Sequence, residues 1–94
     1  MTSHTATLTT ARASTYLQQL CKHFGHKVEV EFTPTDGRVT LPMGVCTLHA
    51  DETALALTVS GEAENLARME KVIGDHLARF AFREDFTLDW QAAA

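Results

Sequence analysis

The chain has 94 residues, 45% of them hydrophobic, and its eight basic and twelve acidic residues give a formal net charge of −4. This length predicts one domain over residues 1–94, with an ordered core over about 5–90 and a frayed start at residues 1–4. The sequence has no run rich in Lys or Arg and no apolar run of membrane-spanning length, which disfavours binding to nucleic acid and insertion into a membrane. The first ten residues lack the basic and apolar regions of a secretory signal, so we expect a cytoplasmic protein with reduced thiols.

Residues 5–10 alternate between apolar and polar side chains and predict a first strand. Residues 11–24 predict a helix, because apolar side chains recur three and four positions apart. This apolar stripe consists of Ala13, Tyr16, Leu17, Leu20, Cys21 and Phe24. A hydroxyl of Thr9 or Thr10 is expected to cap the start of the helix. Gly25 is expected to end it in the left-handed conformation, which glycine adopts without steric cost.

Four further alternating segments predict strands at residues 27–33, 38–41, 45–50 and 54–60. In the first of these segments, Val28, Val30 and Phe32 are expected to face the core. The Thr-Pro-Thr-Asp-Gly sequence of residues 33–37 predicts a turn, because proline fixes φ and the Asp-Gly step tolerates a positive φ.

Residues 62 to 80 or 82 predict a second helix, flanked on its apolar side by a partly buried His76. Its apolar stripe consists of Leu66, Met69, Ile73, Leu77 and Phe80. Residues 86–90 alternate again and predict a last strand. The fold class is therefore α+β, an antiparallel-rich sheet of about six strands with two helices packed on one face, in the order βαββββαβ. The second to fifth strands are expected to form a meander, and the neighbours of the first and last strands are left open.

The other face of the sheet is expected to carry small and polar side chains. These are Thr7, Thr9, Glu29, Glu31, Thr40, Thr47, His49, Ala56, Thr58, Thr87 and Asp89. Such a face can be solvated or can dock a partner, including a second copy of the chain. As a candidate binding surface it is represented by Glu29, Glu31, Thr47, His49 and Thr58.

The sequence contains no glycine-rich phosphate loop, no nucleophile elbow and no CxxC pair, so no catalytic residue, cofactor or metal is predicted. Cys21 and Cys46 both take positions that face the core, where cysteine acts as a small hydrophobe. These observations favour a protein that is not an enzyme, although they leave the question open.

A candidate ligand or partner site consists of Cys21, His23, His26, Lys27 and Cys46. A count of alternating chain directions places these residues at one end of the sheet. The same count places His76 toward the other end, so the histidines are not expected to form one centre. Successive helical residues turn by about 100°, so Cys21 and His23 diverge by about 160° and cannot chelate one ion. We expect instead that the cysteines pack in the core while His26 and Lys27 cap carbonyls at the end of the helix.

Three segments carry a family resemblance: YLQQLCKHFGHKVEVEF at 16–32, GRVTLPMGVCTLHAD at 37–51 and HLARFAFRE at 76–84. In collinear order over nearly the whole chain, they resemble the bacterial family called domain of unknown function 2218. Its most specific pieces are CKHFGHK, the Gly-x-Cys step at 44–46 and HLARFAFRE. The family has no established activity, so the resemblance implies no catalytic residue. Similar proteins are sometimes joined to, or found beside, siderophore-interacting flavin reductases, which implies an accessory role in iron handling with such a reductase as a partner.

Three hypotheses follow from the residues and the resemblance. The first is a non-enzymatic binding or accessory domain linked to iron and siderophore metabolism. The second is a metal- or thiol-dependent activity built on Cys21, His23, His26 and Cys46. The third is homo-oligomerisation through the threonine-rich sheet face. Metal content distinguishes the first two, and the mass in solution tests the third.

Overall fold

The protein was analysed as a computed structural model that describes residues 2–81 and 88–92. The elements are β1 (Thr2–Thr9), α1 (Ala13–Phe24), β2 (Glu29–Phe32), β3 (Asp36–Leu41), β4 (Gly44–Ala50), β5 (Ala54–Gly61), α2 (Ala63–Phe80) and β6 (Gln91–Ala92). The predicted α+β class and the order βαββββαβ are both confirmed. No helix in the described residues is long and apolar enough to cross a membrane.

The six strands form one antiparallel sheet in the order β2-β3-β4-β5-β1-β6. Strands β2 to β5 form the predicted meander. The sequence did not predict the neighbour of the first strand. In the structure β1 lies beside β5 and pairs with it from Thr2↔Gly61 to Thr9↔Ala54. Side chains reinforce this pairing, since the Ser3 and Ser60 hydroxyls lie 2.7 Å apart.

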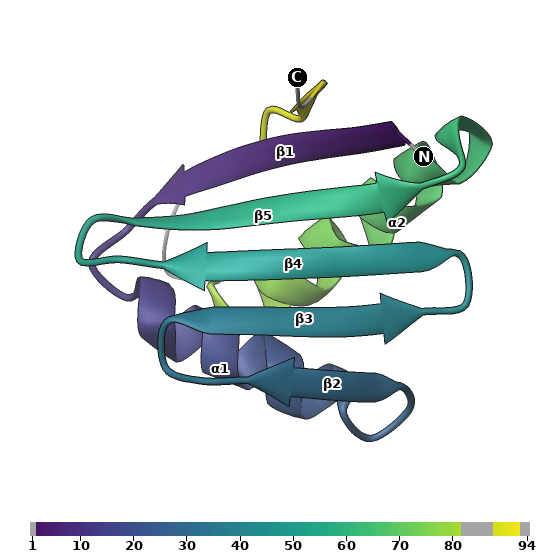
Figure 1. The fold of residues 1–94 in the computed structure, drawn as a ribbon. Helices are drawn as coiled ribbons and strands as arrows, with labels where there is room; N and C mark the ends of the chain where they lie inside the picture. Colours follow the sequence, from purple (N-terminus) through teal and green to yellow (C-terminus); the bar gives the residue numbers. More distant parts are fainter. Residues whose placement is uncertain (1, 82–87, 93–94) are drawn as a thin grey trace.

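Both helices cover the same face of the sheet, as predicted (Figure 1). α1 packs on β2 to β5, whereas α2 packs on β1 and β5 and also contacts α1. All six residues of the predicted α1 stripe are buried, as are Leu66, Met69, Ile73 and Leu77 of α2. The periodicity of these side chains therefore identified the buried face of each helix, and the core lies between the helix layer and the sheet.

The expected fraying of residues 1–4 is wrong for the part that the structure describes. β1 begins at Thr2, because residues 2–4 pair with the last residues of β5. His4 lies opposite Val59 and turns toward α2, where its Nδ1 lies 2.9 Å from Glu70 Oε1. A polar contact to α2 therefore anchors this start of the sheet.

The ends of α1 differ from the prediction. Neither predicted threonine caps the helix, whose N-cap residue is Arg12 without a side-chain cap; the Thr10 hydroxyl instead accepts the Arg12 N–H at 3.0 Å. Gly25 has φ −59° and ψ −17°, so the predicted left-handed conformation is also wrong. The chain instead continues in a tight turn, in which the N–H groups of Lys27 and Val28 both donate to the Phe24 carbonyl at 2.9 Å.

Two other glycines are required because of close approach. Gly37 lies within β3, which begins at Asp36, and not in the predicted turn. A Cβ atom at Gly37 would lie 2.8 Å from Cys21 Sγ, so the glycine leaves room for that sulfur. Gly44 has φ +156°, and a Cβ atom there would collide with the Ser60 carbonyl oxygen. This second glycine allows β4 to start directly against the end of β5.

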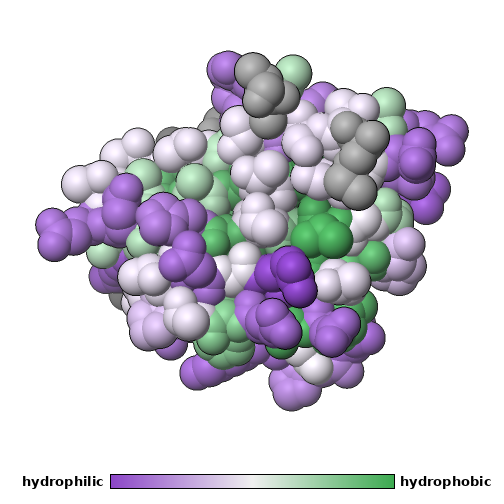
Figure 2. All heavy atoms as spheres, in the orientation of Figure 1, coloured by the Kyte–Doolittle hydropathy of each residue, from purple (hydrophilic) through white to green (hydrophobic). Residues whose placement is uncertain are grey.

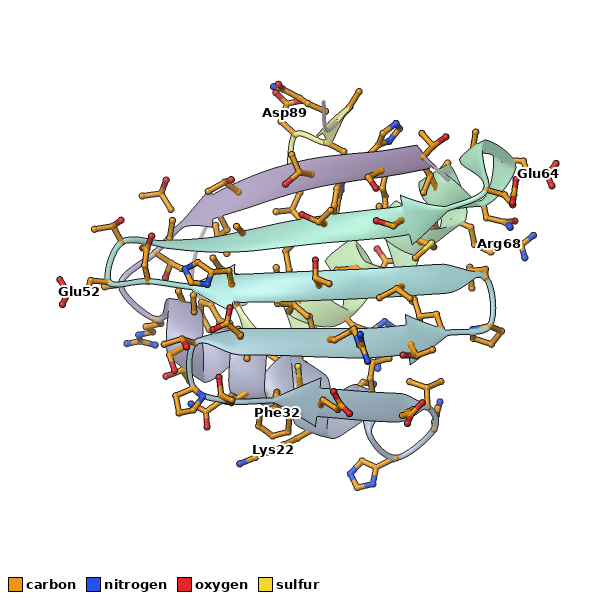
Figure 3. All side chains as sticks on the ribbon, viewed as in Figure 1. Lys22, Phe32, Glu52, Glu64, Arg68 and Asp89 are labelled. Atoms are coloured by element: carbon orange, nitrogen blue, oxygen red, sulfur yellow. The ribbon has the colours of Figure 1, made fainter. Side chains whose placement is uncertain are left out.

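The two sheet edges also depart from the sequence pattern. Phe32 has the predicted inward parity but is 39% exposed, because it lies at the end of edge strand β2; Figure 3 shows it beside Lys22 of α1. The last strand was predicted at residues 86–90, of which 86–87 lie outside the described residues. The observed β6 is shorter and later, pairing Gln91 with Thr5, while Leu88 and Trp90 pack against the core.

Candidate ligand-binding site

The two thiols of the predicted site are buried in the core. Cys21 and Cys46 are both free and 0% exposed. Burial raises the pKa of the Cys21 thiol to about 11 and that of the Cys46 thiol to about 12. A thiol acts as a nucleophile or a metal ligand as the thiolate, so both cysteines are suited to packing, as the inward parities predicted.

The remaining predicted residues do not complete a metal site with these thiols. Within residues 2–81 and 88–92, no group of three or more His, Cys, Asp or Glu side chains is arranged to hold a metal ion. Cys21 faces the sheet, whereas the ring of His23 contacts α2 and is only partly buried. The divergence of these two side chains around α1 is therefore as predicted.

The prediction that His23 and His76 lie at opposite ends of the molecule is wrong. Their ring centroids are 4.8 Å apart. The count of chain directions treated each helix as parallel to the strands. Figure 1 shows that α2 instead runs obliquely behind the sheet, so that its later turns approach α1. The two histidines meet across this helix–helix contact.

Two phenylalanine rings surround the histidine pair. Phe24 lies with its ring centroid 4.8 Å from that of His76, and Phe80 lies 5.9 Å from His23. His76 Nδ1 donates to the Val72 carbonyl oxygen at 2.6 Å, one turn back along α2. In the neutral ring this hydrogen bond leaves Nε2 as the atom that can accept a proton or a ligand donor.

The surroundings of the pair are positively charged. Partial burial lowers the pKa of His23, and so do the positive charges of Arg79 and Lys27 and those that His76 and His26 carry when protonated. We call these five side chains, His23, His26, Lys27, His76 and Arg79, the histidine cluster. Nearby positive charge disfavours protonation of His23. A bound anion would offset this positive charge, so the cluster is suited to binding an anion.

The carbonyl groups at the end of α1 accept hydrogen bonds from backbone N–H groups and not from the side chains of the histidine cluster. As expected, His26 and Lys27 cap this end, but they do so through their backbone N–H groups, to the carbonyls of His23 at 3.4 Å and Phe24 at 2.9 Å. Within the described residues, the structure records no hydrogen bond from the side chains of His26, Lys27 or Arg79. Among the described residues, no partner therefore competes with a ligand for these nitrogen donors.

The open sheet face has the predicted composition. Glu29, Glu31, Thr47 and His49 are exposed and Thr58 is half-buried. Figure 2 shows pale and apolar residues across the middle of this face and hydrophilic ones mainly at its margins. The charges of β2 to β4 pair among themselves, with Arg38 Nη2 3.7 Å from Glu31 Oε2 and His49 Nδ1 2.9 Å from Asp36 Oδ1. Hydrogen bonding to Asp36 raises the pKa of His49, while His49 and then Thr35 lower the pKa of Asp36.

A hollow lies at the edge of this face. It has a volume of about 360 Å³ and is lined by Glu31, Phe32, Thr33, Asp36, Gly37 and Arg38. Its carboxylates are engaged with His49 and Arg38, so it offers fewer unpaired groups than the histidine cluster does.

Comparison with known proteins agrees with this fold. Residues 5–91 match the family described as "Uncharacterized protein conserved in bacteria (DUF2218)". The chain belongs to this family. The NMR structure of PA4090 from Pseudomonas aeruginosa is similar, with 37% sequence identity and a TM-score of 0.81 over 97% of this chain and 96% of the other. No curated protein matches the chain significantly. Membership in DUF2218 identifies the fold and leaves the function to be argued from the site.

The part of the cluster that the sequence did not reveal lies on α2. His76, Arg79 and Phe80 are three and four positions apart, so they share one side of the helix. That spacing was a usable signal, but it showed only that these residues share a side. Their approach to His23 depends on the crossing of α1 and α2, which no local pattern contains.

Proposed function

We propose that this protein is a non-enzymatic binding domain whose ligand site is the histidine cluster. The observation that carries the proposal is the 4.8 Å approach of His23 and His76 across two helices, amid side-chain nitrogen donors that have no hydrogen-bond partner among residues 2–81 and 88–92. Polar groups that converge beside aromatic rings are typical of ligand sites. Buried structural histidines, in contrast, have their nitrogens satisfied by the protein itself.

The physiological context that we propose is iron and siderophore metabolism in the cytoplasm. It rests on the family resemblance, since similar proteins occur joined to or beside siderophore-interacting reductases. In this role the domain would hold a ferric siderophore or its released ligand for such a partner. The chemistry of the cluster supports this, because siderophores present oxygen atoms that imidazolium, ammonium and guanidinium groups can contact.

The alternative of a thiol-dependent activity has less support. Cys21 and Cys46 are fully buried, and burial holds both thiols in the protonated form. His23 and His76 remain partners for a ligand, but in the part of the chain that the structure describes they do not join a third His, Cys, Asp or Glu side chain in an arrangement that could hold a metal ion.

The test is a titration of the protein with ferric siderophores of three classes: a tris-catecholate, a hydroxamate and a hydroxycarboxylate. We expect at least one class to bind, and the H23Q/H76Q variant to bind it at least about tenfold more weakly, which is about 1.4 kcal/mol. H49Q is the matched control, because it removes an imidazole from the opposite face. Equal affinity in wild type and H23Q/H76Q, or no binding of any class, would contradict the proposal.

A further inference from the structure

Resting on the proposed function, we infer that the histidine cluster binds an oxyanion, a carboxylate or phosphate group, and that His23 takes up a proton as the anion binds. This assigns the ligand class and a proton-linked mode of binding to the site.

The first step concerns charge. The chain as a whole has a net charge of −4, yet two of the side chains that act on His23, Lys27 and Arg79, carry a positive charge, and the other two are imidazoles that gain one when they are protonated. From α2 they are His76 and Arg79, and from the turn after α1 they are His26 and Lys27. The carboxylate adjacent to His76 in sequence, Asp75, lies 3.2 Å from Lys71 Nζ and is thereby engaged on its own helix. The local charge that an incoming anion meets at this site is therefore positive, although the net charge of the whole molecule is negative.

The second step excludes the simplest structural role for these cations. Basic residues in the last turn of a helix are favoured by the helix dipole, and α1 and α2 both have them there. At α1, however, the terminal carbonyls already accept backbone N–H groups. Lys27 lies beyond the helix and is exposed, and its ammonium group has no carbonyl partner among the described residues.

The third step gives the proton balance. Desolvation by partial burial and, after it, the positive charges nearby lower the pKa of His23 from its ordinary 6.5, so the ring is mainly neutral in the free protein near pH 7. A bound anion reverses the field at the ring, so His23 takes one proton from solvent and donates an N–H to the anion oxygen. The rings of Phe24 and Phe80 lie against His23, with their centroids 5.7 Å and 5.9 Å from that of its ring. By linkage, binding that takes up a full proton weakens by up to about tenfold for each unit of rising pH.

The experiment uses citrate and inorganic phosphate as separate probes, which distinguishes the carboxylate from the phosphate source. Calorimetry at pH 7 in two buffers of different ionisation enthalpy measures proton uptake, and the histidine ring resonances report the pKa of His23 with and without the anion. We expect uptake of a fraction of one proton, an affinity at least about threefold weaker at pH 8 than at pH 7, and a higher His23 pKa in the complex.

The variants separate local contacts from general electrostatics. K27Q and R68Q each remove one positive charge from an exposed position, and Figure 3 shows Arg68 near Glu64 at the start of α2. We expect K27Q to weaken anion binding several-fold and R68Q to leave it nearly unchanged, whereas H23Q abolishes the proton uptake. Because Lys27 is exposed, K27Q tests the inference even if H23Q is poorly folded.

Three results would overturn the inference in different ways. If neither anion moves the His23 resonances, but a cationic ferric hydroxamate does, the ligand class is wrong and the proposed function stands. If no probe moves the resonances of His23 or His76, both the inference and the proposed function fail. Anion binding that K27Q and R68Q weaken equally would also overturn the inference, because the cluster would then have no special role.

Discussion

Cys21 and Cys46 show how the environment of a residue decides its chemistry. By type, thiols beside histidines fit a metal or nucleophile site. By position, both are fully buried between α1 and the sheet, and desolvation raises the pKa of each thiol well above its ordinary value of 9.0. Burial therefore outweighs residue type.

The reactivity of these thiols gives a first prediction. At pH 8, both cysteines should react with a water-soluble disulfide reagent far more slowly in the folded protein than in guanidinium chloride, because the folded thiols are buried and protonated. The measurement is the rate of thiol release, with the unfolded protein as the reference for two reactive cysteines. Rapid labelling of the folded protein would revive the thiol-dependent alternative.

The pair of His49 and Asp36 gives a pH prediction. Asp36 raises the pKa of His49 above its ordinary 6.5, so the stability that His49 contributes is present below pH 6.5 and is lost as pH rises through the higher folded value. The pKa of Asp36 is lowered from 3.8, so its contribution is present above that pH and is lost as pH falls through the lower folded value. The pair therefore stabilises the fold between these two limits.

The variant D36N tests this pairing. We expect the pKa of His49, measured from its ring resonances, to fall toward 6.5 in D36N, and the loss of stability to be greater at pH 5.5 than at pH 8. A His49 pKa that does not change in D36N would show that the 2.9 Å contact is not formed in solution.

At the scale of elements, the local patterns were sufficient to place the strands and the buried helix faces. The stripe of α1 is buried as predicted, and so is that of α2 except for Phe80, which is only partly buried. In β4 and β5, the side chains that alternate with the open face are buried as well. The predictions that were wrong concern positions whose burial or residue type depends on an element distant in the sequence. Phe32 is exposed because β2 is an edge strand, and Gly37 is needed because a cysteine of α1 packs against β3.

The contact between α1 and β3 gives a prediction about stability. Adding a methyl group in G37A places a Cβ atom 2.8 Å from Cys21 Sγ, and such overpacking costs about 1–3 kcal/mol. In a C21A background the sulfur is gone, so the same substitution should cost much less. Denaturant unfolding of the wild type, both single variants and the double variant measures this coupling. Equal costs in the two backgrounds would mean that the sulfur does not limit this position.

In the candidate site too, the local sequence pattern predicted only some of the residues, and the packing of the two helices adds the others. The sequence nominated His23, His26 and Lys27 from one end of α1, and these residues do belong to the histidine cluster. It placed His76 at the other end of the molecule, because the alternation of chain directions carries no information on the crossing of two helices. An oblique α2 brings its later turns to α1 and adds His76 and Arg79.

For the whole molecule, the sheet separates two surfaces of different character. The helix side carries the histidine cluster, in which the basic groups of Lys27 and Arg79 act on a histidine pair beside aromatic rings. The open face carries small uncharged residues in its middle and paired charges at its margin. A ligand on the first surface would leave the second free for a reductase or for a second copy of the chain, so ligand binding and partner docking can occur together.

The location of a bound ferric ligand tests the account most directly. High-spin iron(III) broadens the resonances of nearby nuclei, and the gallium complex of the same siderophore serves as the diamagnetic reference. With the siderophore class that binds, we predict selective broadening of the amide signals of His23, His26, His76 and Arg79, with those of Thr47 and Thr58 unaffected. Broadening centred on Thr47 and Thr58, or spread evenly over the chain, would contradict the assignment of the histidine cluster as the ligand site.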